Sequence, residues 1–103
     1  MLINEGDIIT IDGVSCWVLL IVANELPIEC SFLEGKGLFC LFNNKDGNPS
    51  VDYVHIDNLL KSDIEIHGNK NTSNCFHNDF LYWKVFFADS PLFRDALVKK
   101  IEL

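Results

Sequence analysis

The stretch covering residues 6–23 constrains the fold of this chain more than any other, because it indicates two strands joined by a tight turn. Residues 7–11 are rich in β-branched side chains and end at an Asp12-Gly13 pair, which favours a two-residue hairpin turn with positive φ angles. Residues 14–23 are almost wholly apolar. A strand that is apolar on both faces is covered on both faces, so we place residues 18–22 at the centre of a closed or sandwiched sheet.

The middle of the chain predicts further short strands. After Pro27 ends the second strand, the apolar runs 28–33 and 38–42 flank two glycines and predict another hairpin. The polar run 43–50 predicts an exposed loop, and the alternation over 51–56 predicts a strand. A single helical turn over 57–61, with Asp57 as a possible N-cap, is expected to plug the end of a barrel.

The second half of the chain contains one more alternating segment, which is followed by a polar run, an aromatic-rich run and a helical pattern. Residues 64–67 predict a half-exposed strand, the polar run 68–74 predicts a mobile segment, and the aromatic-rich run 80–87 predicts a strand. Ser90 and Pro91 suit a helix start. Apolar residues then recur at spacings of three and four, which predicts a C-terminal helix packed on the sheet; they are Leu92, Phe93, Ala96, Leu97 and Ile101.

Length and charge limit the class of protein. With 103 residues the chain forms one domain (1–103) that can bury a core without disulfides or a metal. Fifteen acidic residues against eight basic ones give a net charge of −7, which disfavours direct binding to a phosphate backbone. The same charge favours a basic partner, and the plainer alternative is a soluble acidic surface.

The location of the protein is expected to be the cytoplasm, with no membrane contact. No basic segment followed by an apolar run opens the sequence, and residues 14–23 are too few to span a bilayer. We therefore expect the four cysteines to be reduced thiols that bind no metal; they are Cys16, Cys30, Cys40 and Cys75.

The opening segment resembles the first two strands of small SH3-like barrels, because Gly6-Asp7-Ile8-Ile9 is followed by a turn and then by a strand that contains Trp17. Among those barrels it resembles the PemK/MazF type of endoribonuclease toxin, which would imply RNA cleavage. That family has an Arg-Pro pair before its second strand and uses arginine in its cleavage site, whereas the single arginine here, Arg94, falls on the predicted C-terminal helix. We therefore expect a mainly β (α+β) fold: a small SH3-like barrel or a bent antiparallel sheet with a C-terminal α-helix.

Three sets of residues are candidate sites. Cys75 and His77 are two residues apart, so on an extended segment their side chains would point the same way and could share a metal or form a thiolate-imidazole pair. No partner ligands accompany them in the sequence. We therefore expect a loop cysteine and an exposed histidine. Four carboxylates are expected to gather on one surface through strand pairing, as a partner-binding patch rather than a glycosidase pair; they are Asp52, Asp57, Asp63 and Glu65. Tyr82 and Trp83 are candidate interface anchors or core residues.

These observations favour a small acidic module that binds a basic protein, without cofactor and without catalysis. We expect an inhibitor or immunity-like protein that occupies the basic surface of a nucleic-acid-handling enzyme. A lysine- and asparagine-rich, arginine-poor composition is compatible with a phage or bacterial product. Two alternatives stay open, a PemK/MazF-like endoribonuclease toxin with a degenerate site and a structural accessory domain.

Overall fold

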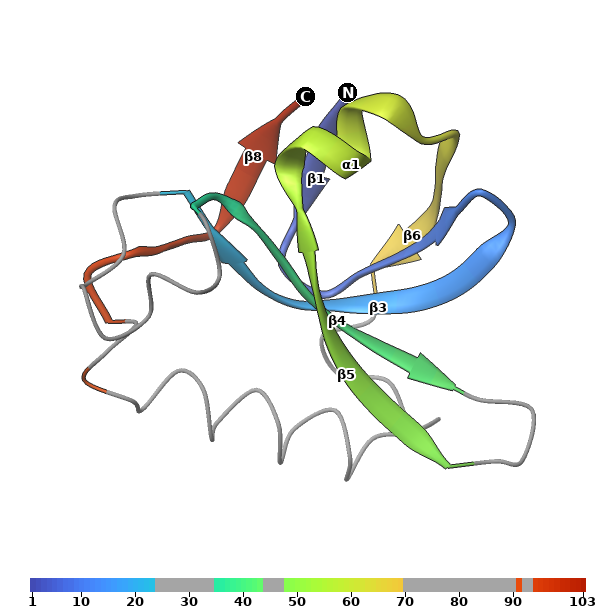
Figure 1. The fold of residues 1–103 in the computed structure, drawn as a ribbon, viewed down its shortest axis with the longest axis horizontal. Helices are drawn as coiled ribbons and strands as arrows, with labels where there is room; N and C mark the ends of the chain where they lie inside the picture. The colour runs from blue at the N-terminus through green and yellow to red at the C-terminus, as the bar shows by residue number, and fades with distance from the viewer. Residues whose placement is uncertain (24–34, 44–47, 70–90, 92–93) are drawn as a thin grey trace.

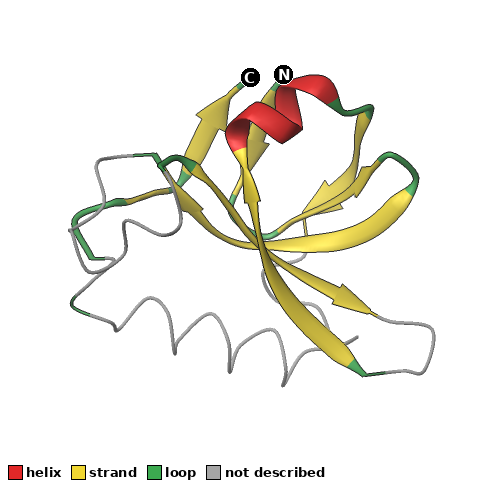
Figure 2. Cartoon of the chain, in the orientation of Figure 1, coloured by secondary structure: helices red, strands yellow, loops and turns green. Residues whose placement is uncertain are grey.

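The computed structural model describes residues 1–23, 35–43, 48–69, 91 and 94–103, and these form strands and one short helix. The elements are, in chain order, β1 (Leu2–Asn4), β2 (Asp7–Ile11), β3 (Val14–Val22), β4 (Gly37–Asn43), β5 (Pro49–His55), α1 (Ile56–Lys61), β6 (Ile64–Asn69), β7 (Leu97–Val98) and β8 (Lys100–Glu102) (Figure 1). Strands dominate the described part of the chain, as Figure 2 shows. The prediction of a mainly β protein is confirmed.

Six of the described strands form a bent antiparallel sheet, and β1 and β8 form a separate two-stranded sheet. Five strands follow the order β5-β4-β3-β2-β6, and β7 pairs with the end of β3. Register shifts between Ile8 and Ile9 in β2 and between Val18 and Leu20 in β3 mark irregularities of the kind that bend strands. Among the described residues β5 and β6, the two ends of the path, do not pair with each other, so the sheet does not close into a barrel there.

The opening hairpin is confirmed. Ile11 of β2 pairs with Val14 of β3, and the two turn residues between them have φ angles of 51° (Asp12) and 84° (Gly13). Positive φ at both central residues is the geometry that suits the right-handed twist of the flanking strands, and an Asp-Gly pair adopts it at low cost.

Strand β3 lies at the centre of the sheet and has a core cluster on each face. One cluster contains Trp17, Leu20 and Val22 with Phe39 and Leu41 of β4. The other includes Val18 and Ile21 of β3, Leu38 and Cys40 of β4, Ile9 of β2, Ile3 of β1, Leu59 of α1 and Ile64 of β6. Residues 18–22 are at most 3% exposed, so the prediction that they are covered on both faces at the centre of the sheet is confirmed, although the described strands do not close that sheet into a barrel.

The predicted C-terminal helix is wrong. Leu97 and Val98 form β7 beside the end of β3, and residues 100–102 form β8 beside β1. In β8 Ile101 packs against the core while Lys100 and Glu102 are exposed, which is a period of two rather than of 3.6. The helical spacing therefore arose from Ala96, which lies in a turn, and from Leu97 and Ile101, which belong to two short strands; Leu92 and Phe93 lie outside the described residues.

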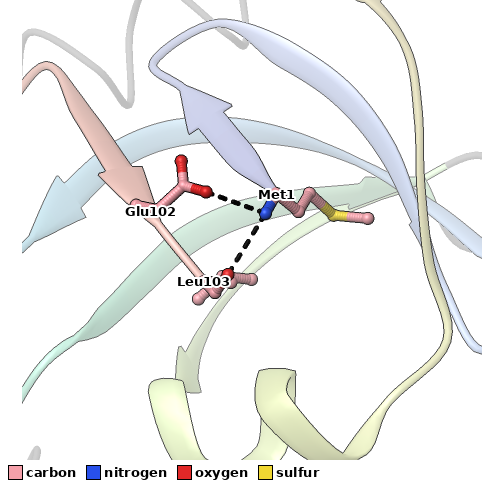
Figure 3. A network of polar contacts seen from close by, with 3 residues as sticks. All are labelled: Met1, Glu102 and Leu103. Atoms are coloured by element: carbon pink, nitrogen blue, oxygen red, sulfur yellow. Dashed lines mark hydrogen bonds and ion pairs between the residues drawn. The ribbon is translucent and has the colours of Figure 1, made fainter.

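The chain ends are joined by the β1–β8 pair. The amino group of Met1 donates hydrogen bonds to Glu102 Oε1 at 3.0 Å and to the carbonyl oxygen of Leu103 at 3.1 Å (Figure 3). The Leu103 N–H donates in turn to the carbonyl oxygen of Met1 at 2.7 Å.

The short helix is confirmed, with a different cap from the one predicted. Helix α1 begins at Ile56, and the ring nitrogen Nδ1 of His55 accepts a hydrogen bond from the Asp57 N–H at 3.1 Å. His55, rather than Asp57, is therefore the N-cap, and Asp57 lies in the first turn. Leu59 is buried, so the helix covers part of the core, but the described strands form no closed barrel for it to plug.

Other predicted segments have mixed outcomes. The strands expected at 51–56 and 64–67 correspond to β5, which ends at His55, and to β6. Of the loop expected at 43–50, Asn43 belongs to β4 and Pro49 and Ser50 belong to β5, while residues 44–47 lie outside the described residues. Gly68 and Asn69 extend β6 into the run 68–74. Three predicted segments lie outside the described residues: 28–33, 70–74 and 80–87. Within the described part of the chain, no helix has the length and apolar character to cross a membrane.

Candidate functional site

The β2–β3 turn is tied to the connection between α1 and β6 by a reciprocal pair of hydrogen bonds. The Asp12 N–H donates to the carbonyl oxygen of Asp63 at 2.8 Å, and the Asp63 N–H donates to Asp12 Oδ1 at 2.8 Å. Both aspartates are exposed. Sequence reasoning treated Asp12 only as a turn residue; the signal that it lies beside Asp63 is the pairing of β2 with β6, which no local pattern shows.

Glu65 extends this arrangement along β6. It pairs with Thr10 of β2, two positions along the ladder from the junction of Asp12 and Asp63, and residues two apart in a strand point to the same face. His67 Nε2 lies 3.2 Å from Thr10 Oγ1 and 3.9 Å from Glu65 Oε2. We call Asp12, Asp63 and Glu65 the acidic surface. In the described part of the chain, none of the three forms an ion pair with lysine or arginine.

The two remaining predicted carboxylates lie elsewhere. Asp57 is exposed in the first turn of α1, with Oδ2 3.6 Å from His55 Nδ1. Asp52 lies in β5 and pairs with Cys40 of β4, so it points to the sheet face that carries Cys40 and Val18.

Asp52 and Glu65 therefore occupy opposite faces of the sheet. Glu65 shares its face with Thr10 and Ser15, while Asp52 shares the other with Cys40. Their strands, β5 and β6, are also at the two ends of the sheet path. Strand pairing in the described residues does not gather the four predicted carboxylates. Asp63 and Glu65 are neighbours because they are two residues apart in the chain, and the pairing of β2 with β6 adds Asp12 to them.

An apolar pocket lies at the end of the sheet near the β2–β3 turn. Its volume is about 360 Å³, and it is lined by Ile8, Val14, Ser15, Cys16, Trp17, Leu41, Phe42 and Pro49. Val14 is 56% exposed, whereas Cys16 and Trp17 are buried. Val14 lines this pocket, and Asp12 of the acidic surface stands two residues before it in the β2–β3 turn, so the acidic surface begins close to the pocket.

Two carboxylates that sequence reasoning did not select are buried at the other end of β2. Asp7 accepts hydrogen bonds from the Asn4 N–H at 2.7 Å and from Asn69 Nδ2 at 2.8 Å. Glu5 Oε2 lies 3.4 Å from Lys99 Nζ. Because these carboxylates have partners that join β1, β2, β6 and the β7–β8 link, their arrangement serves the fold.

The described cysteines are free thiols. Cys16 and Cys40 are buried and unbonded to another sulfur, as expected. Cys30, Cys75, His77, Tyr82 and Trp83 lie outside the described residues. Within the described part of the chain, no group of three or more histidine, cysteine or acidic side chains is arranged to hold a metal ion.

Arg94 lies in a turn before β7, where it is exposed, and not on a helix.

Comparison with known proteins gave no significant match, whether to a family model, to a curated protein or to a solved structure.

Proposed function

We propose that this protein is a binding module for a basic protein and that the acidic surface, formed by Asp12, Asp63 and Glu65, is its contact region. The observation that carries the proposal is that these three exposed carboxylates lie close together, in the β2–β3 turn, the α1–β6 connection and the start of β6. No lysine or arginine is paired to them among the described residues. An uncompensated patch of one sign accelerates encounter with a surface of the opposite sign.

The kind of partner follows from the overall charge. At a net charge of −7 the chain repels nucleic acid and attracts proteins that bind it. We therefore propose an inhibitor or immunity-like role, in which the acidic surface occupies the basic groove of a nucleic-acid-handling enzyme. Asp52 and Asp57 would act only through the long-range field, because they lie away from the acidic surface.

We also propose that the fold is a variant of the SH3-like small barrel. The chain forms a meander from β2 to β5, then passes through one short helix, and β6 returns to pair with β2. The short helix between β5 and β6 is the element that was expected to plug one end of such a barrel, and it supports the proposal.

The test uses amide substitutions that keep shape and hydrogen bonding. Asp12→Asn, Asp63→Asn and Glu65→Gln together remove three charges, while an amide oxygen at position 12 can still accept from the Asp63 N–H. After capture of a partner from host lysate and its identification by mass spectrometry, we expect the triple variant to lower the association rate constant about tenfold at low salt. Added salt should slow wild-type association, because the screening length falls to roughly 8 Å at physiological ionic strength.

Matched variants distinguish an effect of the acidic surface on association from an effect of net charge. Asp52→Asn, Asp57→Asn and Glu102→Gln remove the same number of charges elsewhere and should slow association much less. Lys61→Gln should leave binding unchanged or tighter. Equal effects of the two triple variants, or binding that ignores both salt and substitution, would show that the acidic surface is not the contact region.

A further inference from the structure

The apolar pocket is built on the sheet face that carries Trp17. Ile8 of β2, Trp17 of β3 and Leu41 of β4 pair in a single row across three strands, and all three line the pocket. Ser15 also lines it and stands two residues before Trp17 in β3, so its side chain points to the same face. The pocket therefore combines a row of three apolar side chains with one hydroxyl.

The next row on this face is polar and leads to the acidic surface. Ser15 pairs with Thr10, and Thr10 pairs with Glu65. Because neighbouring strands lie about 4.8 Å apart, the backbone of Glu65 is roughly 10 Å from that of Ser15. Asp12 is close along the chain, two residues before Val14 of the pocket. Two carboxylates of the acidic surface thus lie beside the pocket.

The pocket is open to solvent at the end near the β2–β3 turn. Val14 and Ser15 are exposed there, whereas Trp17 and Leu41 are buried. Its volume of about 360 Å³ is at the small end of ligand pockets, which begin at about 300 Å³, so it suits one aromatic group rather than an extended ligand. A ring placed there would lie against Trp17 and Phe42, and contacts between aromatic rings are favourable.

We propose that the pocket binds an aromatic side chain of the basic partner, while a neighbouring lysine or arginine of that partner lies on the acidic surface. This inference rests on the proposed function, because the acidic surface supplies the charge contact. Protein interfaces commonly combine a large apolar anchor in a desolvated pocket with a polar rim. Here the pocket is the anchor site, and Asp12 and Glu65 belong to the rim.

The charges beside the pocket select its occupant. An acidic segment would bring its carboxylates toward Asp12 and Glu65, and like charges repel. A neutral apolar segment would contact the pocket but would gain nothing from the carboxylates. A segment that has an aromatic residue within about three positions of a basic residue reaches both, since three extended residues span roughly 10 Å.

Three synthetic peptides with blocked ends test the inference without the unidentified partner. The first has a phenylalanine, a glycine and two lysines; the second replaces phenylalanine with alanine, and the third replaces both lysines with glutamine. NMR titration of the full chain at low salt measures each dissociation constant. We expect the first peptide to bind at least about fivefold more tightly than the second. It should bind about twofold to fivefold more tightly than the third, and shift the amide signals of residues 14–17 and 41–42.

Two protein variants remove the two halves of the contact separately. Ser15→Trp fills the pocket from its exposed end, and Leu60→Trp, at an exposed position of α1, is its matched control. We expect Ser15→Trp to abolish the preference for phenylalanine over alanine and to keep the preference for lysine over glutamine. The triple amide variant of the acidic surface should do the reverse. Circular dichroism checks that each variant folds, and the three peptides on the wild-type chain decide the main point without the variants.

The outcomes distinguish this inference from the proposed function. Equal affinity of the wild-type chain for the phenylalanine and alanine peptides, or signal shifts centred away from the pocket, would overturn the pocket assignment. If the lysine peptides still bound better than the glutamine peptide, the acidic surface would keep its support. A phenylalanine preference without any lysine preference would overturn the proposed function, and with it the coupled contact. Absence of binding by all three peptides would also overturn the pocket assignment.

Discussion

Position 37 requires glycine because two strands approach closely there, and not because of an unusual backbone angle. A Cβ atom at this position would lie 2.4 Å from the carbonyl oxygen of Val54 and 2.8 Å from Cζ of Tyr53. The backbone oxygen cannot move without disturbing the pairing of β4 with β5. We expect Gly37→Ala to lower the free energy of unfolding by about 1–3 kcal/mol, measured by urea denaturation.

Gly13 provides the contrasting control. A Cβ atom there meets nothing within 4 Å, but its φ of 84° disfavours side chains. Gly13→Ala should cost roughly 1 kcal/mol through backbone strain, and Gly13→Asn less, because asparagine tolerates positive φ. A Gly37→Ala variant as stable as wild type would mean that the two strands are not in close contact at this point.

Tyr53 predicts a loss of stability at alkaline pH. Its hydroxyl donates to the carbonyl oxygen of Gly35, and burial raises its pKa to about 12, from 10.0 for the free side chain. Below pH 10 the phenol is neutral in both states and its contribution is fully present. Between about pH 10 and 12 the unfolded chain releases the proton while the folded chain holds it, so the free energy of unfolding falls.

Urea denaturation across this pH range measures the effect of Tyr53, and ultraviolet absorbance of the phenolate reports the pKa. A Tyr82→Phe background leaves one tyrosine to observe. Adding Tyr53→Phe should remove the part of the alkaline loss that depends on the phenol. An ordinary titration of Tyr53, near pH 10, would contradict its burial.

Helix α1 contributes to stability through one side chain. Leu59 is 2% exposed and packs in the cluster that contains Ile9 and Val18, whereas the adjacent Leu60 is 62% exposed. We expect Leu59→Ala to lower the free energy of unfolding by about 2–5 kcal/mol. Leu60→Ala should change it by about 0.5 kcal/mol or less. Similar costs for the two substitutions, in thermal or urea denaturation, would show that α1 does not cover the core in this way.

For the molecule as a whole, the pairing of the two chain ends makes the C-terminal strand part of the core. Ile101 and Leu103 pack against the cluster that holds Ile3. Deleting residues 100–103 should therefore lower the free energy of unfolding by about 2–4 kcal/mol, since two partly buried aliphatic side chains are lost. Thermal and urea denaturation of the shortened chain measure this effect.

Glu102→Gln separates packing from charge at the same place. It removes the ion pair between Glu102 and the Met1 amino group. Because the side chains of Met1 and Glu102 are 41% and 68% exposed, the substitution should lower the free energy of unfolding by less than about 1 kcal/mol. A shortened chain with unchanged stability would show that β8 is a dispensable tail.

The sequence by itself determined the local elements. The Asp12-Gly13 turn, the apolar strand through Val18, strand β6 and the short helix around Leu59 follow from turn chemistry and hydrophobic period, which act between near neighbours in the chain. It also selected Asp63 and Glu65 as candidate members of an acidic patch, and both residues are exposed in the structure.

Only the tertiary structure decided how these elements meet. The spacing of Ala96, Leu97 and Ile101 fits both a helix and two short strands, and the open positions beside β3 and β1 selected the strands. Pairing of β2 with β6 brought Asp12 to Asp63, while the positions of β5 and β6 at opposite ends of the sheet separated Asp52 from Glu65. Hydrophobic period reports which side of an element is buried, but the partner that buries it is chosen by packing and backbone hydrogen bonding over the whole chain.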